Sequence, residues 1–75
     1  MQFALVLKPG FARDVQRREQ LIASVRHMKG VRRLETEMAA NGLLLAELMN
    51  PADVTSLEGL DGIATVEGMG VKSAW

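Results

Sequence analysis

Apolar and polar residues alternate in two segments of the chain, residues 2–8 and residues 31–38, as in strands with one buried face. In the first segment the larger apolar side chains share one face: Phe3, Leu5 and Leu7. Two further short apolar segments lie between turn residues, at 43–49 and 63–67. Pro9 and Gly10 follow the first segment and predict a turn. The pattern therefore predicts four β-strands.

Two other segments have the spacing or the end signals of helices. In residues 12–29 the apolar residues recur at helical intervals: Val15, Leu21, Ile22, Val25 and Met28. Gly30 follows this segment, and glycine is a typical residue just past the C-terminus of a helix. Asn50 and Pro51 have the residue types of an N-cap and a first helical position, and Asp53 places an acid near the positive end. These signals predict a second, short helix over about residues 51–58.

The predicted elements occur in the order β-α-β-β-α-β. Asn41 and Gly42 separate the second and third strands, and this pair favours a tight hairpin because both residues tolerate positive φ. An antiparallel four-stranded sheet with both helices on one face satisfies this order, which is the ferredoxin-like α+β arrangement. We expect one domain over residues 1–70 and an extended tail over residues 71–75.

The composition limits what can stabilise such a domain. The chain has 75 residues, no cysteine and a single histidine, so we expect neither a disulfide nor a bound metal ion. No apolar run approaches the roughly 18 to 20 residues that span a bilayer, and we expect no membrane partner. A domain of this size buries only about 60% of the surface of its unfolded chain. Its stability should therefore be marginal.

Residues for catalysis are not grouped by any motif. His27 lies near the predicted end of the first helix, where an imidazole can bond to the last carbonyl groups. No motif sets a histidine beside a serine, and the glycines of the second half do not precede a helix as a phosphate loop requires. We therefore expect neither enzymatic activity nor a cofactor, and a function in binding another protein.

The charges are divided between the two halves of the chain. Residues 1–33 contain eight basic residues and two acidic ones, whereas residues 34–75 contain one basic residue and seven acidic ones. Four arginines fall in or near the first helix: Arg13, Arg17, Arg18 and Arg26. They suggest an interaction or regulatory module that binds an acidic partner through this helix. Binding of nucleic acid is less favoured, because the first and third predicted strands offer only one aromatic residue for base stacking, Phe3. Phe3 shares a face with Leu5 and Leu7, so we expect it in the core.

Four segments of the chain form a recognisable set: FALVLK at residues 3–8, NGLLLAEL at 41–48, the short helix that ends LEGL at 57–60, and GIATVE at 62–67. Together they resemble the propeptides of subtilisin-like serine proteases and the fungal inhibitors related to them. The resemblance covers nearly the whole chain. In that family the domain binds a protease and assists its folding.

The end of the sequence adds to the resemblance, since members of the family finish about eight residues beyond the Val-Glu pair with a large apolar residue. Here Trp75 lies eight residues after Glu67. The resemblance implies that the tail lies in the protease cleft as an added strand. It places Trp75 at P1, Ala74 at P2, Ser73 at P3 and Lys72 at P4, with Val71 also fitting the pattern. Glu67 would cap the N-terminus of a protease helix.

These observations lead to two hypotheses of different classes. The first is a propeptide-like inhibitor and folding assistant, or intramolecular chaperone, of a subtilisin-like protease that binds through Glu67 and residues 71–75. The alternative is a small cytoplasmic interaction module that uses the arginines of the first helix and has no protease target. A cleaved propeptide would be extracellular, whereas a native start at Met1 implies the cytoplasm. We expect a monomer or a weak homodimer.

Overall fold

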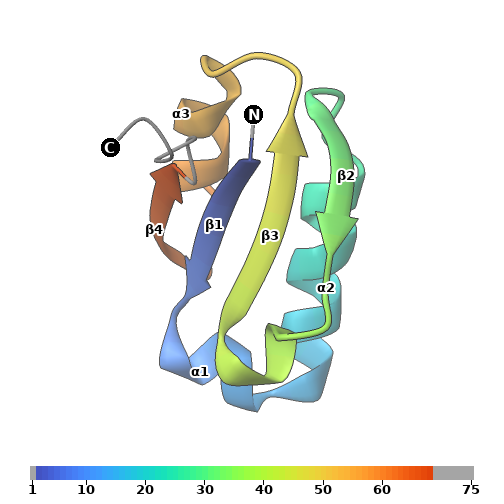
Figure 1. Ribbon diagram of the computed structural model, residues 1–75. Coiled ribbons are helices and arrows are strands. Elements are labelled where there is room, and N and C mark those ends of the chain that lie inside the picture. Colours follow the sequence, from blue (N-terminus) through green and yellow to red (C-terminus); the bar gives the residue numbers. More distant parts are fainter. Residues whose placement is uncertain (1, 69–75) are drawn as a thin grey trace, which may run out of the picture.

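The computed structural model describes residues 2–68. Its elements are β1 (Gln2–Leu7), α1 (Pro9–Arg13), α2 (Val15–Arg26), β2 (Val31–Glu35), the 3-10 helix η1 (Ala39–Asn41), β3 (Leu43–Leu48), α3 (Asp53–Glu58) and β4 (Ile63–Gly68). The four strands form one sheet in the order β2-β3-β1-β4, and all neighbours are antiparallel (Figure 1). The predicted α+β, ferredoxin-like arrangement is therefore confirmed. No helix within the described residues is long and apolar enough to cross a membrane.

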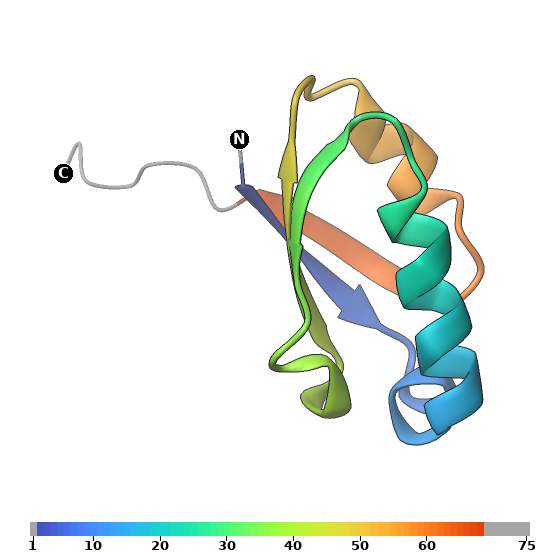
Figure 2. The same cartoon turned by 90° about the vertical axis from the view of Figure 1, so that its right-hand side faces the viewer.

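The molecule has two layers. Figure 2 shows α2 and α3 on the same side of the sheet, and no described helix lies against its other side. We call that other side the open face; it is turned toward the viewer in Figure 1, where the strands lie in front of the helices. One layer of helices on a four-stranded sheet gives a single core between the layers.

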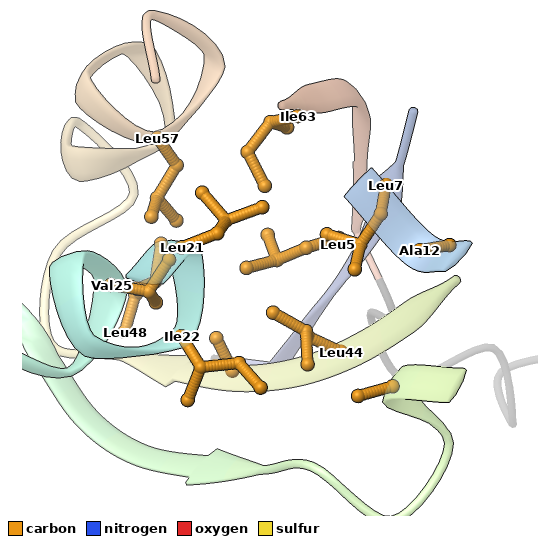
Figure 3. Packing of buried hydrophobic residues seen from close by; sticks show 12 residues of the cluster. Leu5, Leu7, Ala12, Leu21, Ile22, Val25, Leu44, Leu48, Leu57 and Ile63 are labelled. Atoms are coloured by element: carbon orange, nitrogen blue, oxygen red, sulfur yellow. The ribbon is translucent and has the colours of Figure 1, made fainter. Parts of the chain in front are cut away.

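The core lies between the sheet and the helices (Figure 3). Its members are buried apolar side chains from both layers: Leu5, Leu7, Ala12, Leu21, Ile22, Val25, Ala39, Leu44, Ala46, Leu48, Leu57 and Ile63. The strand members alternate with residues of the open face, because successive side chains of a strand point to opposite sides. Phe3 is partly buried and packs against this cluster, which confirms the core role expected for it.

The first helical segment is two helices rather than one. The sequence predicts a turn at Pro9 and a helix over residues 12–29. In the structure Pro9 begins α1, and the extended backbone of Asp14 separates α1 from α2. Proline suits the first helical position because its φ is already fixed and its missing N–H needs no partner there. Val15, predicted to point inward, is 59% exposed, because the break places it at the start of α2 and outside the buried stripe.

The connection between β2 and β3 is longer than the predicted hairpin. β2 ends at Glu35 instead of continuing to Met38, and η1 occupies part of the turn. Gly42 has a φ of 85°, so the positive φ expected at this position is present. It occurs at the C-terminal cap of η1, however, and not in a tight hairpin turn. The alternation predicted over residues 31–38 would place Met38 on the same side of the strand as Leu34, but Met38 lies beyond the end of β2 and is 47% exposed.

The remaining boundaries differ by one or two residues. β1 ends at Leu7, and β4 continues to Gly68. α3 begins at Asp53, and the Asn50 side-chain oxygen accepts a hydrogen bond from the Ala52 backbone N–H at 2.9 Å within the preceding turn. Asn50 therefore lies two residues before the N-cap position, which is Ala52, instead of at the cap as predicted. It satisfies a backbone donor in the turn ahead of the helix.

Asp14 provides the N-cap of α2, and its removal should be measurable. Its carboxylate accepts a hydrogen bond from the Arg17 backbone N–H at 3.1 Å. The Asp14→Ala change should lower the free energy of unfolding by about 1 kcal/mol, since the N–H loses its partner. Asp14→Asn retains an acceptor oxygen and should be close to neutral. Urea unfolding followed by circular dichroism measures both; equal losses would show that the charge, not the cap, matters.

Candidate protein-binding site

Glu67 lies on the open face, near the end of β4. The register pairs it with Ala4 of β1, and residues directly opposite in an antiparallel pair project to the same side. In β1, Ala4 lies between Phe3 and Leu5, whose side chains face the core, so the Ala4 and Glu67 side chains project away from it. Glu67 is exposed and forms no ion pair with another described residue. Its carboxylate is therefore available to a partner that approaches this face.

The other predicted residues of the protease-binding site are Val71, Lys72, Ser73, Ala74 and Trp75. They lie outside the described residues, so the structure places one of the six residues of this site. Gly68 ends β4 directly after Glu67 and is opposite Phe3 in the sheet. Within the described residues, the candidate protease-binding site therefore consists of the end of β4 and the open face, on which Glu67 lies.

The open face has an apolar centre, which the sequence analysis did not identify. Val6 of β1 is opposite Leu43 of β3, and Ala4 is opposite Leu45. All four are half-buried although no described helix covers them. Their alternation with core residues in β1 and β3 is visible in the sequence. Only the strand register shows that they form one patch.

Carboxylates border this patch. Glu35 of β2 is opposite Leu45, on the far side of the patch from Glu67. Glu47 lies further along β3; its carboxylate is 3.7 Å from the Arg32 guanidinium, and it is opposite Arg33 in the register. Glu47 thus has cationic neighbours, whereas Glu35 forms no ion pair within residues 2–68.

The arginines predicted to form the alternative site border three different hollows among residues 2–68. Arg13, Arg17 and Arg18 each line a different one, and Arg26 lines the same hollow as Arg18. That shared hollow, about 310 Å³ between α2 and the β2–β3 connection, is also bordered by Glu19 and Glu37. Two cations and two anions around one hollow give no net positive charge.

Two of these arginines are also engaged within the chain. The Arg18 guanidinium donates a hydrogen bond to the Ala12 carbonyl at 2.6 Å, which ties α2 to α1. Arg17 lies 3.9 Å from the Asp14 carboxylate and 5.6 Å from the centre of the Phe11 ring. The guanidinium over the ring has cation–π geometry. The contacts of Arg18 with Ala12 and of Arg17 with Phe11 join α2 to α1.

Within residues 2–68 the structure brings no three histidine, aspartate or glutamate side chains together in a geometry that could hold a metal ion. His27 is at the C-terminal cap of α2, with its Nδ1 2.7 Å from the Ala23 carbonyl oxygen. Its ring therefore bonds to a carbonyl near the helix end, as predicted for this position.

The fold and the open face together define a small α+β, ferredoxin-like domain with a sheet surface that no described helix covers and that glutamates border. Comparisons with models of protein families, with curated proteins and with solved structures found no match.

Proposed function

We propose that this chain is a propeptide-like inhibitor and folding assistant of a subtilisin-like serine protease. The observation that carries the proposal is the position of Glu67, exposed on the open face one residue before β4 ends. It supports the role given to Glu67 by the resemblance, in which the carboxylate meets the unpaired N–H groups of a protease helix. Residues 71–75 follow and would supply the strand in the protease cleft.

The location of Glu67 also determines the side on which the protease would lie. A protein that contacts the Glu67 carboxylate must approach the open face, because the side chain projects away from the helices. The apolar centre of this face, around Leu45 and Ala4, would then be buried with it. Burial of apolar area supplies affinity that the tail alone lacks.

Such an interface would also account for assistance in folding. A ligand that binds only the folded form of a protein stabilises that form, and the stabilisation grows with ligand concentration relative to Kd. A domain that binds the folded protease surface through the open face and its cleft through the tail would favour the native protease. In refolding of denatured subtilisin, the full chain should raise the yield of active enzyme above that obtained without it.

The alternative, an interaction module built on the arginines of α1 and α2, has less support from the geometry. Its four arginines border three separate hollows, and Arg18 is bonded to the Ala12 carbonyl. An acidic partner would therefore meet these cations one or two at a time. Pull-down with Arg13, Arg17, Arg18 and Arg26 changed to glutamate tests this alternative, which requires that the partner be lost.

Inhibition of subtilisin tests the leading proposal. The full chain should slow hydrolysis of a chromogenic peptide, and deletion of residues 71–75 should raise the inhibition constant at least about 100-fold, since several main-chain hydrogen bonds of about 1 kcal/mol each are lost. Glu67→Gln should raise it by roughly 2- to 20-fold, the range for a charge at a helix terminus.

Glu58→Gln is the matched control, since Glu58 is also exposed but lies in α3 on the helix side. It should leave the inhibition constant unchanged. Equal inhibition by the full and shortened chains, or no inhibition by either, would remove the cleft-binding mechanism. An effect of Glu58→Gln as large as that of Glu67→Gln would show that only net charge is being sensed.

A further inference from the structure

β2 forms one edge of the sheet, and its outer side presents backbone hydrogen-bonding groups. In the order β2-β3-β1-β4 no described strand lies beyond it. The Met49 N–H donates to the Gly30 carbonyl at 2.9 Å, just past β3 and just before β2. Residues of an antiparallel strand bond to a given neighbour at every second position, so Leu45 and Glu47 of β3 also bond to the residues opposite them in β2. Leu34, between those two residues, therefore directs its N–H and C=O away from β3, as at an open strand edge.

The side chains on either side of Leu34 have a pattern that is complementary to itself. Arg33 and Glu35 are exposed, and both lie on the open face. Neither forms an ion pair with a described residue. Leu34 faces the other way and packs against the core. When two β2 strands pair antiparallel about Leu34, each Arg33 is opposite the partner's Glu35, and the two leucines are opposite each other.

The charges of α2 on the same side of the molecule follow the same symmetry. Figure 1 shows α2 behind β2. Glu19 and Arg26 both border the hollow that also reaches Thr36, directly after β2. They are seven positions apart, about two helical turns, and so lie on one side of α2. A two-fold axis through Leu34 reverses α2 as well, which turns Glu19 toward the end of the helix that carries the partner's Arg26.

We propose that two copies of this chain pair through β2 into one continuous antiparallel sheet, with both helix layers on the same side. The central pair of hydrogen bonds joins the two Leu34 backbones, and two contacts between Arg33 and Glu35 flank it. Such a two-fold interface is closed. The inference does not rest on protease inhibition, because Glu67 lies on β4 at the opposite edge of the sheet, and it can hold if that function fails.

Pairing of β2 with the partner's β4 would extend the sheet less favourably. With Leu34 opposite Val66, Arg33 is opposite Glu67, but Glu35 is opposite the uncharged Thr65. This arrangement therefore has one contact between opposite charges where the two-fold pair has two. It also leaves an edge at each end, so it would add further copies without closing.

Sedimentation equilibrium of the full chain tests for the dimer. A reversible equilibrium between monomer and dimer is expected, with a Kd on the order of 100 µM because the interface is small. A chain that stays monomeric up to about 1 mM would overturn the inference. Growth beyond the dimer would overturn it as well, since it would indicate the open-ended pairing.

Two charge variants locate the interface. Arg33→Glu and Glu35→Arg each convert both flanking contacts into like-charge contacts and should raise the Kd at least about fivefold. Mixed together, the two variants should form a heterodimer with a Kd near that of the wild type. One copy then has glutamate at both positions and the other has arginine at both, so unlike charges face each other again. A defect in folding could not be rescued in this way.

Glu67→Arg is the control, because it reverses a charge on the open face at the other edge of the sheet. It should leave the Kd unchanged, and circular dichroism confirms that each variant is folded. A loss as large as that of Arg33→Glu would assign the contact to β4 or to net charge. A mixture that associates no better than either variant alone would also contradict the inference. So would concentration-dependent amide shifts of the wild type centred on α3 or β4 instead of β2.

Discussion

The Leu44→Ala variant is expected to lose roughly 2–5 kcal/mol of unfolding free energy, the range for a buried leucine truncated in a packed core. Leu44 is fully buried, lies on the central strand β3 and is opposite Leu5, which is also fully buried. A 75-residue domain has about 4–11 kcal/mol in total at typical values per residue. The variant should therefore lose a large share of the stability of the domain and unfold at a clearly lower urea concentration than the wild type.

Leu45→Ala is the matched control for this prediction. The two leucines are adjacent in the sequence, but Leu45 projects from the open face and is only half-buried. Its truncation should cost clearly less, because the side chain already contacts water and leaves no enclosed cavity. Urea unfolding gives both midpoints, and the slopes should agree with the wild type. Equal losses would mean that the open face is covered as tightly as the core.

The strands were predictable because their pattern is a direct result of burial. One side of β1 faces the core and the other faces solvent, so its larger apolar residues Phe3, Leu5 and Leu7 fall on every second position. Residues 12–29 showed the helical period for the same reason, and three of the five expected inward positions are buried. Local alternation and a few turn residues were enough to give the order of the four strands and of the two larger helices, but not α1 or η1.

The break at Asp14 was not predictable from periodicity alone. Pro9 ends a strand equally well as it begins a helix, and the choice depends on whether the following residues can pack. Here Ala12 is buried in the core and its carbonyl accepts a hydrogen bond from Arg18, so tertiary contacts favour α1. A sequence window shows neither contact.

The candidate site was predictable to different degrees at its different parts. Glu67 could be placed near the end of β4 from its neighbours, but its membership of an acid-bordered apolar face depends on pairing with Ala4, far away in the sequence. For the arginines of α2, position in the sequence was a poor guide to position in space. Arg17 and Arg26 are nine positions apart, which turns them about 180° from each other around the helix. Their closeness in sequence therefore overstated their closeness in space.

Gly62→Ala is expected to destabilise the domain by at least about 2 kcal/mol through two separate effects. Gly62 has φ of 103°, a region that costs a residue with a Cβ about 1–3 kcal/mol. A Cβ at this position would also lie 2.6 Å from the Phe11 ring. The backbone has little freedom to move away, because the Gly62 carbonyl accepts a hydrogen bond from the Lys8 N–H at 2.8 Å.

Gly10→Ala is the control, since Gly10 lies within α1 and a Cβ there would meet no atom within 4 Å. It should be neutral or stabilising by about 0.5–1 kcal/mol, because alanine is the better helix former. A double-mutant cycle with Phe11→Ala separates the two effects at Gly62. The loss caused by Gly62→Ala should shrink in that background as the ring contact disappears, but should not vanish, because the cost of positive φ remains. An unchanged loss would show that the ring moves aside at no cost, and no loss in either background would contradict the positive φ itself.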